Sequence, residues 1–254
     1  MKRSYFSLPE DYKLAWEADF TKPLDTDFWY ISDGMRKGGY WSPEQLILKD
    51  GKLIIRTEYK ENGDKSGYYC GDLYWRKLRS TYGYYEIKCK VDNIRGAWSA
   101  FWLMPDDISN KEQKAQDGCE IDIFENAIPH MLQTTLHYDD YKSQVMTTRY
   151  KKNFYEGFHT YALDWKKDSL KFYYDNQLIW TVTNPNHISH YPNRLEISTE
   201  VNGFNGKPNP FFWFGNGLIT SKCNKGKLPY DYIIDYVKVY DNGQLKWSES
   251  ELNL

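Results

Sequence analysis

Apolar and polar positions alternate along most of this chain with the period of a β-strand. Residues 82–91 show this well, because Glu86, Lys88 and Lys90 alternate with apolar residues, as in a half-buried strand. Residues 106–116 are polar and predict a surface loop with a short helical turn. Long amphipathic helices are missing, which disfavours a βαβ architecture and predicts an all-β protein. The other segments that predict strands are 51–57, 97–104, 120–125, 134–138, 158–165, 169–174, 177–180 and 232–240.

The composition strengthens the all-β prediction. The 254 residues include 23 Tyr, 10 Trp and 12 Phe, which is 18% of the chain, and 17 Gly and 10 Pro supply turns. No long linker or repeat divides the sequence, and about 250 residues still fit one sandwich or barrel. We therefore expect a single domain over residues 1–254, long enough to bury a large core without disulfides or metals.

The charge balance argues against several kinds of partner. Lys and Arg number 33 against 35 Asp and Glu, a net charge of −2, whereas nucleic-acid binding needs a strong positive excess. The same balance argues against a polybasic membrane-surface protein. No apolar run approaches the roughly 20 residues that cross a bilayer. The stretch MKRSYFSLPEDYKL at residues 1–14 begins with basic residues but lacks the apolar core of a signal peptide.

The four cysteines are Cys70, Cys89, Cys119 and Cys223, and none lies in a CxxC pair, so a zinc site is not expected. Cys89 and Cys119 each alternate with apolar residues along a predicted strand, as small core residues do. Two interpretations stay open from the sequence, namely buried free thiols and a disulfide.

The candidate chemistry lies in the strand Glu120-Ile-Asp122-Ile-Phe124-Glu125. Residues two apart on a strand share a face, so Glu120 and Asp122 point one way and the isoleucines point into a core. Strict alternation sends Glu125 to the opposite face. A one-residue β-bulge near Phe124 returns Glu125 to the face of Glu120 and Asp122, and we predict that bulge.

Three carboxylates on one strand face repel one another, so a purely structural role has little use for them. Glycoside hydrolysis needs one ionised carboxylate as nucleophile or base and one protonated carboxyl as acid. A third acidic neighbour helps to keep their pKa values apart. The aromatic surplus supports this interpretation, because sugar rings stack on Trp and Tyr. The alternatives are a solvated acidic strand edge and a calcium site.

With these residues in view, the sequence resembles glycoside hydrolase family 16, the laminarinase, lichenase and agarase group. The resemblance covers most of the chain, and the order and spacing of its segments make it specific. The motif Glu120-x-Asp122-x-x-Glu125 matches the bulged form of the active-site motif of the family. The other matching segments are WEADF at 16–20, GKL at 51–53, YGYYE at 82–86, WSAFWL at 98–103, FHTYALDW at 158–165 and DYVKVY at 235–240.

The resemblance implies a β-jelly roll of two curved antiparallel sheets with an open cleft on the concave face. It implies endo-hydrolysis of a β-linked polysaccharide with retention of configuration, most simply a β-1,3- or mixed-linkage glucan. By the same resemblance, Glu120 is the nucleophile, Glu125 is the general acid/base, and Asp122 assists between them. No catalytic cofactor is implied.

The resemblance also implies sugar contacts around these carboxylates. Trp98 matches the cleft tryptophan of the family, and Trp102 shares its strand face, although a core position suits Trp102 equally. Trp75 lies in a segment that feeds the non-reducing-side subsites of related enzymes. Trp213 belongs to an aromatic loop that either lines the other end of the groove or anchors that loop in the core.

Two polar residues complete the set of candidate binding residues. His137 is similar to a histidine near the reacting sugar in laminarinase-like members, and its alternative is an ordinary strand histidine. Arg76 follows Trp75, and it either hydrogen-bonds sugar hydroxyls or forms a surface salt bridge.

One departure from the family concerns specificity. Laminarinases and lichenases usually carry a Trp shortly before the first catalytic Glu, but residues 114–119 contain none. A galactose-based substrate has an axial 4-hydroxyl and needs a differently shaped floor, so an endo-β-galactosidase is the alternative enzyme. A non-catalytic carbohydrate-binding jelly roll is the alternative from another class, and the intact carboxylates count against it.

The remaining expectations concern metals and context. Many members of this family hold a structural calcium, for which the matching positions are Glu17, Gly51 and Asp235, partly through their backbone carbonyls. No HExxH, P-loop, GxGxxG or GxSxG motif occurs. We expect a polysaccharide or oligosaccharide as the partner, no nucleic acid, no membrane, and a monomer. Extracellular action is inferred from the size of the substrate.

Overall fold

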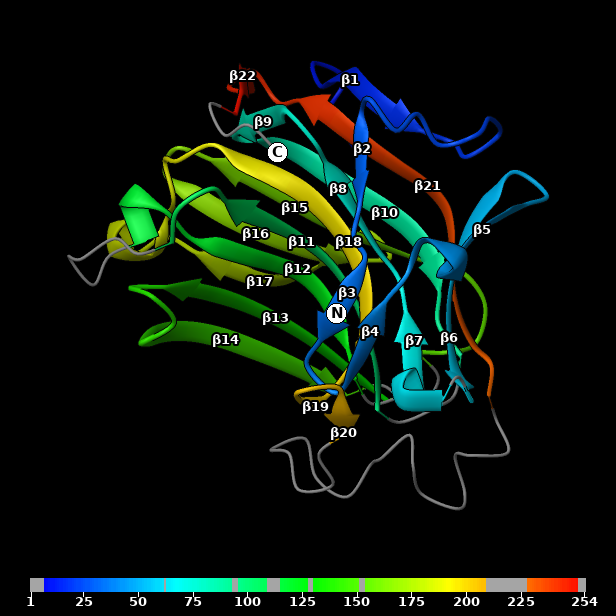
Figure 1. The fold of residues 1–254 in the computed structure, drawn as a ribbon. Coiled ribbons are helices and arrows are strands. Elements are labelled where there is room, and N and C mark those ends of the chain that lie inside the picture. The colour runs from blue at the N-terminus through cyan, green and yellow to red at the C-terminus, as the bar shows by residue number, and fades with distance from the viewer. Residues whose placement is uncertain are drawn as a thin grey trace.

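Antiparallel strands account for almost all of the regular structure. The computed structural model describes residues 7–61, 63–92, 96–108, 115–127, 130–150, 154–208 and 228–250. Two large sheets form a β-jelly roll, and Figure 1 shows them stacked as curved layers. The described residues include no helix long and apolar enough to cross a membrane.

The first sheet runs, in spatial order, through β17 (Gln177–Val182), β16 (Ser169–Tyr174), β15 (His159–Lys166), β10 (Gly83–Lys90), β21 (Tyr230–Asp241), β6 (Lys52–Lys60), β7 (Gly67–Cys70), β4 (Gly39–Trp41) and β3 (Gly34–Arg36). On its edges, β1 (Lys13–Ala18) pairs with β21, and β5 (Leu46–Lys49) pairs with β6. The pairs are antiparallel except β4 with β7, which is parallel.

The second sheet runs through β14 (Ser143–Tyr150), β13 (Met131–Tyr138), β12 (Glu120–Asn126), β11 (Ala97–Pro105), β18 (Asn193–Val201), β8 (Asp72–Trp75) and β2 (Trp29–Ile31). β9 (Leu78–Thr81) pairs with β18 and with β22 (Lys246–Glu249). A small hairpin joins β19 (Gly203–Phe204) to β20 (Lys207–Pro208). The described 3-10 turns are η1 (Pro43–Gln45), η2 (Gly63–Lys65), η3 (Ala115–Asp117) and η4 (Pro185–His187).

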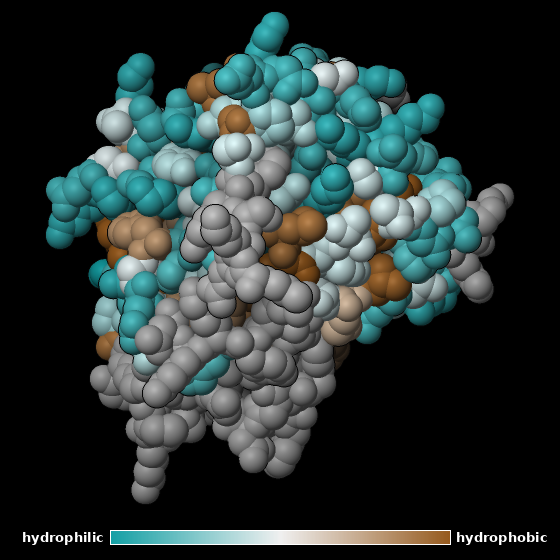
Figure 2. Space-filling model, turned by 180° about the vertical axis from the view of Figure 1, so that it is seen from behind, coloured by the Kyte–Doolittle hydropathy of each residue, from teal (hydrophilic) through white to brown (hydrophobic). Residues whose placement is uncertain are grey.

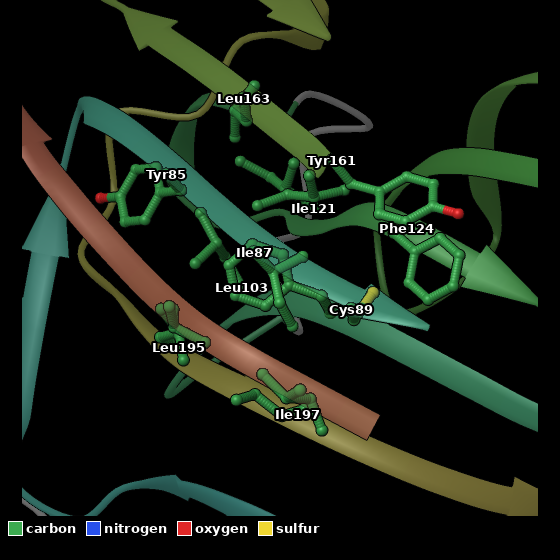
Figure 3. Close-up of a cluster of buried hydrophobic side chains, with 14 of the residues drawn as sticks. Tyr85, Ile87, Cys89, Leu103, Ile121, Phe124, Tyr161, Leu163, Leu195 and Ile197 are labelled. Carbon is green, nitrogen blue, oxygen red and sulfur yellow. The ribbon is translucent and has the colours of Figure 1, made fainter. Parts of the chain in front are cut away.

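The core lies between the two sheets and follows from the alternation in the sequence. β10 contributes Tyr85, Ile87 and Cys89 from the first sheet, and β18 contributes Leu195 and Ile197 from the second; each is at most 1% exposed. Figure 3 shows these side chains meeting between the layers. Burial of this apolar surface is the main favourable term in folding. The predicted strands over 82–91, 97–104 and 120–125 are confirmed as β10, β11 and β12.

Three of the four cysteines lie within the described residues. Cys70, Cys89 and Cys119 are all buried free thiols. Burial raises the pKa of each thiol, because a thiolate loses its hydration there. This outcome agrees with the free-thiol alternative for these three residues, and Cys223 lies outside the described residues.

Candidate active site

A β-bulge in β12 brings the carboxylates to one face. Against β11, Phe124 lies opposite Phe101, but Asp122 lies opposite Trp102, so Ile123 is an extra residue. The pairing with β13 shifts between Asp122 and Glu125 as well. Ile123 and Phe124 both point into the core, at 2% and 1% exposure. Because two successive residues point inward, Glu125 returns to the face of Glu120 and Asp122. This is the bulge that the spacing predicts.

The face so formed is the floor of a cleft of about 610 Å³ on the side of the second sheet away from the core. The strands behind this cleft are β11, β12, β13, β14 and β18, and the turn between β3 and β4 reaches over them. Glu120, Asp122 and Glu125 all line it. The other lining residues are Arg36, Lys37, Trp98, Ala100, Trp102, Gln133, His137, Tyr141, Gln144, Ser198 and Glu200.

Glu125 is held rigidly by three donors. The Nε1 atom of Trp98 donates to Oε1 at 2.9 Å, while Thr135 Oγ1 donates to Oε2 at 3.0 Å and Gln133 Nε2 at 3.4 Å. Burial nevertheless raises the pKa of Glu125, against the opposing effect of these hydrogen bonds and of Lys37. Glu125 therefore holds a proton more readily than a free glutamic acid, and its carboxylate form has donors in place.

Asp122 is buried and Glu120 is half-buried. Burial raises the pKa of Glu120 to about 7; the hydroxyl of Tyr141, which donates to its Oε2 at 2.7 Å, lowers it, and the charge of Glu125 raises it. Burial, then Glu125 and Glu120, raise the pKa of Asp122 well above its ordinary value. The three carboxyls interact, so they titrate as one cluster, and the raised pKa of Asp122 favours its neutral form.

His137 lies beside this cluster as a neutral side chain. Its Nε2 is 3.5 Å from Asp122 Oδ2, and its half-buried ring lines the cleft. Burial and the charge of Lys37 lower the pKa of His137 to about 4. At neutral pH the contact with Asp122 is therefore not an ion pair, and the imidazole is available for hydrogen bonding.

A basic corner closes one side of the cleft. Arg36 and Lys37, at the turn between β3 and β4, both pair with Glu200 of β18, with Arg36 Nε 2.7 Å from Oε2. Burial by itself raises the pKa of Glu200, but Lys37 and Arg36 outweigh it and lower that pKa below its ordinary value. Backbone contacts fix the turn, because Gly38 N donates to the carbonyl of Val201 at 2.8 Å.

The two predicted strand tryptophans do line the cleft. Trp102 donates from Nε1 to Ser198 Oγ at 3.1 Å, which orients its ring. Trp98 instead donates to Glu125, and the Nζ of Lys37 lies 4.1 Å from the centroid of its ring. Trp98 therefore orients the acid/base candidate and lies under a cation, so a bare stacking surface is an incomplete description of it.

Two other predicted binding residues, Trp75 and Arg76, line neither part of the cleft. Trp75 is fully buried in the core, with its ring 5.0 Å from that of Trp16, so a sugar contact does not fit its position. An aromatic side chain suits a core and a cleft equally, which is why the sequence misplaces it. Arg76 donates to the carbonyl of Thr26 at 3.0 Å and lines neither described cavity of the cleft. Trp213 lies outside the described residues.

A second cavity of about 350 Å³ continues the cleft toward β8 and β2. It shares Arg36, Trp102 and Tyr141 with the first cavity, so the two spaces adjoin. Tyr30 and Tyr74 stack on each other at its edge, with ring centroids 4.8 Å apart. The remaining lining residues are Ser32, Asp33, Gly34, Met35, Trp41, Met104, Arg194 and Glu196.

Several of these lining residues were not predicted from the sequence. β18 carries a regular alternation in which Leu195 and Ile197 point inward and Glu196 and Glu200 point to the cleft, so its pattern was a usable signal. Lys37 and Tyr141 come from turns, where no periodicity tells which site a side chain reaches.

Two of the three predicted calcium ligands have side chains that pair with lysines. Asp235 lies 3.3 Å from Lys52 Nζ and 2.8 Å from Lys88 Nζ, and Glu17 lies 3.2 Å from Lys238 Nζ. These ion pairs compete with calcium for the two carboxylates, whereas ligation through backbone carbonyls does not depend on them. Gly51 is a turn residue with φ +66°. In the described part of the chain, the one group with metal-ligand spacing is Glu120, Asp122 and His137, inside the cleft itself.

A jelly roll with three neighbouring carboxyls on a bulged strand in an open cleft is typical of the β-sandwich glycoside hydrolases. The sequence profile of glycosyl hydrolases family 16 matches residues 39–233. The chain therefore belongs to this family and is a glycoside hydrolase.

Known relatives agree with this assignment. The endo-1,3-1,4-beta-glycanase ExoK of Rhizobium meliloti is 28% identical over 64% of this chain and 60% of its own length. The keratan-sulfate endo-1,4-beta-galactosidase of Sphingobacterium multivorum is 26% identical over 91% of this chain and 55% of its own length. The chain thus spans little more than half of either relative. The laminarinase catalytic domain of Thermotoga maritima MSB8 shares the fold, with a TM-score of 0.75, 21% identity and coverage of 92% and 99%.

Proposed function

We propose that this protein is a retaining endo-hydrolase of a β-1,3- or mixed-linkage β-1,3-1,4-glucan. The observation that carries the proposal is the bulge at Ile123, because it places Glu120 and Glu125 in one cleft on either side of Asp122. The relative ExoK, an endo-1,3-1,4-beta-glycanase, supports the choice of a glucan. The adjoining second cavity supports endo action, because a polymer that crosses the active site needs space beyond it.

The residues perform the reaction in two steps. Glu125 in its protonated form donates the proton to the glycosidic oxygen while the carboxylate of Glu120 attacks the anomeric carbon. The leaving chain departs and a covalent glycosyl-enzyme remains. Glu125, now a carboxylate stabilised by Trp98 and Thr135, takes a proton from water, which displaces Glu120 and regenerates the enzyme. The raised pKa of Asp122 favours its neutral form, which reduces repulsion within the cluster.

The roles of the two glutamates are separable by experiment. Glu125→Ala is expected to keep the first step on an aryl β-glycoside with a good leaving group, which needs no proton, seen as a burst of released aryl alcohol. Its second step is expected to be slow without the base, and its activity on the polymer is expected to be lost. Glu120→Ala is expected to lose both the burst and the activity on the polymer, because no covalent intermediate forms. Azide is expected to restore both variants with opposite anomeric products. The same product from both variants would contradict the assignment.

The substrate is tested by a panel of β-glucans and galactans read by product size and linkage. The galactan arm is justified because residues 114–119 hold no Trp and because one relative is a keratan-sulfate galactosidase. Cleavage of galactans alone would replace the glucan proposal by an endo-β-galactosidase. A lectin is tested with Glu120→Gln: binding retained without any turnover in the unmodified protein would favour it.

We propose further that the enzyme degrades polysaccharide outside the cell and acts as a monomer. Polysaccharides are too large to enter a cell, and all three candidate catalytic carboxyls come from one strand of one chain. Fractionation of a producing culture and light scattering of the purified protein test these two points. Activity confined to the cell interior, or a dimer that loses activity on dilution, would contradict them.

A further inference from the structure

The turn between β13 and β14 has an unusual backbone. Asp139, Asp140 and Tyr141 have φ values of 54°, 52° and 62°, in the left-handed region that residues other than glycine rarely adopt. The turn is fixed by hydrogen bonds, since Asp140 N donates to the carbonyl of Ile108 at 3.0 Å and Lys142 N to that of Asp139 at 3.0 Å. Strained conformations of this kind persist where the surrounding structure enforces them, and they gather at functional sites.

The strained turn places Tyr141 across the cleft. Its hydroxyl donates to Glu120 Oε2 at 2.7 Å, while the side chain stays 52% exposed. The ring lies beside that of His137, with centroids 5.6 Å apart. Tyr141 lines both the catalytic cleft and the second cavity, so it stands at their junction. Tyr141 therefore contacts the candidate nucleophile and offers an aromatic face to a substrate chain that extends from one cavity into the other.

We propose that Tyr141 positions the nucleophile Glu120 through its hydroxyl and forms, with its ring, the wall against which a sugar unit of the β-linked polysaccharide packs. The proposal rests on the function proposed above and adds a residue to that site. An exposed aromatic face with a polar tip suits a pyranose ring, whose C–H face packs on the ring while its hydroxyls remain hydrogen-bonded.

The pKa of Glu120 depends on the hydroxyl of Tyr141 and on the charged groups around it. Asp122 and Glu125 face Glu120 from β12, His137 from β13, Lys37 from the β3–β4 turn and Glu196 from β18. Glu125 and Glu196 disfavour a charge on Glu120, while Lys37 and the hydroxyl of Tyr141 favour it. Loss of the hydroxyl is expected to raise the pKa of Glu120, so the nucleophile becomes ionised only at higher pH.

The test compares Tyr141→Phe with Tyr141→Ala. Tyr141→Phe keeps the wall and loses the hydrogen bond, so kcat is expected to fall about tenfold at neutral pH, with the acid limb of the pH profile displaced upward and KM nearly unchanged. Tyr141→Ala loses the wall too, and KM is expected to rise in addition. Tyr59→Phe is the matched control, because Tyr59 is similarly exposed at 48% but lies on β6.

A readout independent of turnover separates this proposal from the proposed function. Carboxyl titration by NMR of glutamate-labelled protein, with the Glu120 signal assigned through Glu120→Gln, is expected to show a higher pKa in Tyr141→Phe. An unchanged pKa and pH profile in Tyr141→Phe would overturn the positioning role, and equal KM values in the two variants would overturn the wall. An unmodified protein without any turnover would overturn the proposed function, while the titration would still decide the contact with Glu120.

Discussion

The candidate catalytic carboxyls of the cleft and the carboxylate of Asp235 on the outer face have pKa values shifted in opposite directions. On the outer face of the first sheet, Asp235 pairs with Lys52 and Lys88; burial by itself raises its pKa, but the two lysines lower it below the ordinary value. In the cleft, burial raises the pKa values of Glu120 and Glu125 despite their hydrogen bonds. Figure 2, which views the molecule from behind, shows mostly hydrophilic residues over the coloured surface. Clustered carboxyls that the fold leaves under-compensated are best explained by chemistry.

The strands that carry these groups differ in the same way. β10 alternates without interruption against β15, so Glu86 stays on the outer side, where Tyr236 donates to it at 2.8 Å. β12 interrupts its alternation at Ile123, and the interruption aims Glu125 into the cleft. A regular strand sorts residues between core and solvent, whereas a bulge re-aims a particular side chain.

The largest expected effect comes from Glu125→Gln measured beside Glu86→Gln. Gln at position 125 keeps the shape but has no proton to give, so kcat on the polymer is expected to fall about 10²–10⁴-fold. Gln at position 86 is expected to leave kcat unchanged, because Glu86 lies on the outer face. Initial rates on soluble glucan decide this, and comparable losses in both variants would contradict the contrast between the two faces.

A smaller effect is expected from the lysines. Lys37→Met leaves the buried Glu200 with Arg36 as its cation, so the free energy of unfolding is expected to fall by about 1–3 kcal/mol. Because Lys37 also lowers the pKa values of Glu120 and Glu125, the acid limb of activity is expected to move upward. Lys88→Met on the outer face is expected to change stability by less than about 1 kcal/mol. Urea unfolding measures the stability of both variants, and pH–rate profiles measure the acid limb of activity. Equal losses of stability in Lys37→Met and Lys88→Met would contradict the difference between the two faces.

The pH dependence of stability is expected to have opposite signs on the two faces. The folded-state pKa of Glu120 is about 7, above its unfolded value, so the folded state binds more protons and its stability falls as pH rises toward 7. Glu120→Gln is therefore expected to stabilise the protein at pH 8 by on the order of 1–2 kcal/mol, and the gain disappears below the unfolded pKa.

Asp235→Asn is the counterpart on the outer face. The pKa of Asp235 is lowered in the folded state, so its carboxylate stabilises the protein above the unfolded pKa, and this contribution is lost as pH falls through the folded pKa. Asp235→Asn is expected to destabilise the protein at pH 7 and to have no effect in strong acid. Thermal unfolding across pH measures both variants, and the same sign in both would refute the comparison.

The smallest expected effect is that of calcium. Lysines neutralise Asp235 and Glu17, so millimolar calcium or a chelator is expected to move Tm by no more than about 1 °C. Differential scanning calorimetry gives the answer. A calcium-dependent rise in Tm would show that the lysines give way to an ion and would restore the site that the resemblance implies.

Much of the local structure could be predicted from the sequence. Alternation in residues 82–91 and 120–125 identified β10 and β12, because side chains on a strand alternate between its two faces. The odd spacing of Glu120 and Glu125 required a bulge, and the register confirms one. These features depend on residues close together in the chain, so they can be derived without knowing the fold.

Which residues from distant segments meet the carboxylates was decided by the tertiary structure. Tyr141, Lys37 and Glu200 come from segments far apart in the sequence, and strand pairing brings them to one cleft. Alternation says that Trp75 has a preferred face but leaves open whether that face is core or cleft, and the packing against Trp16 decided for the core. The physical reason is that periodicity is a local property of the chain, whereas burial depends on which strands become neighbours.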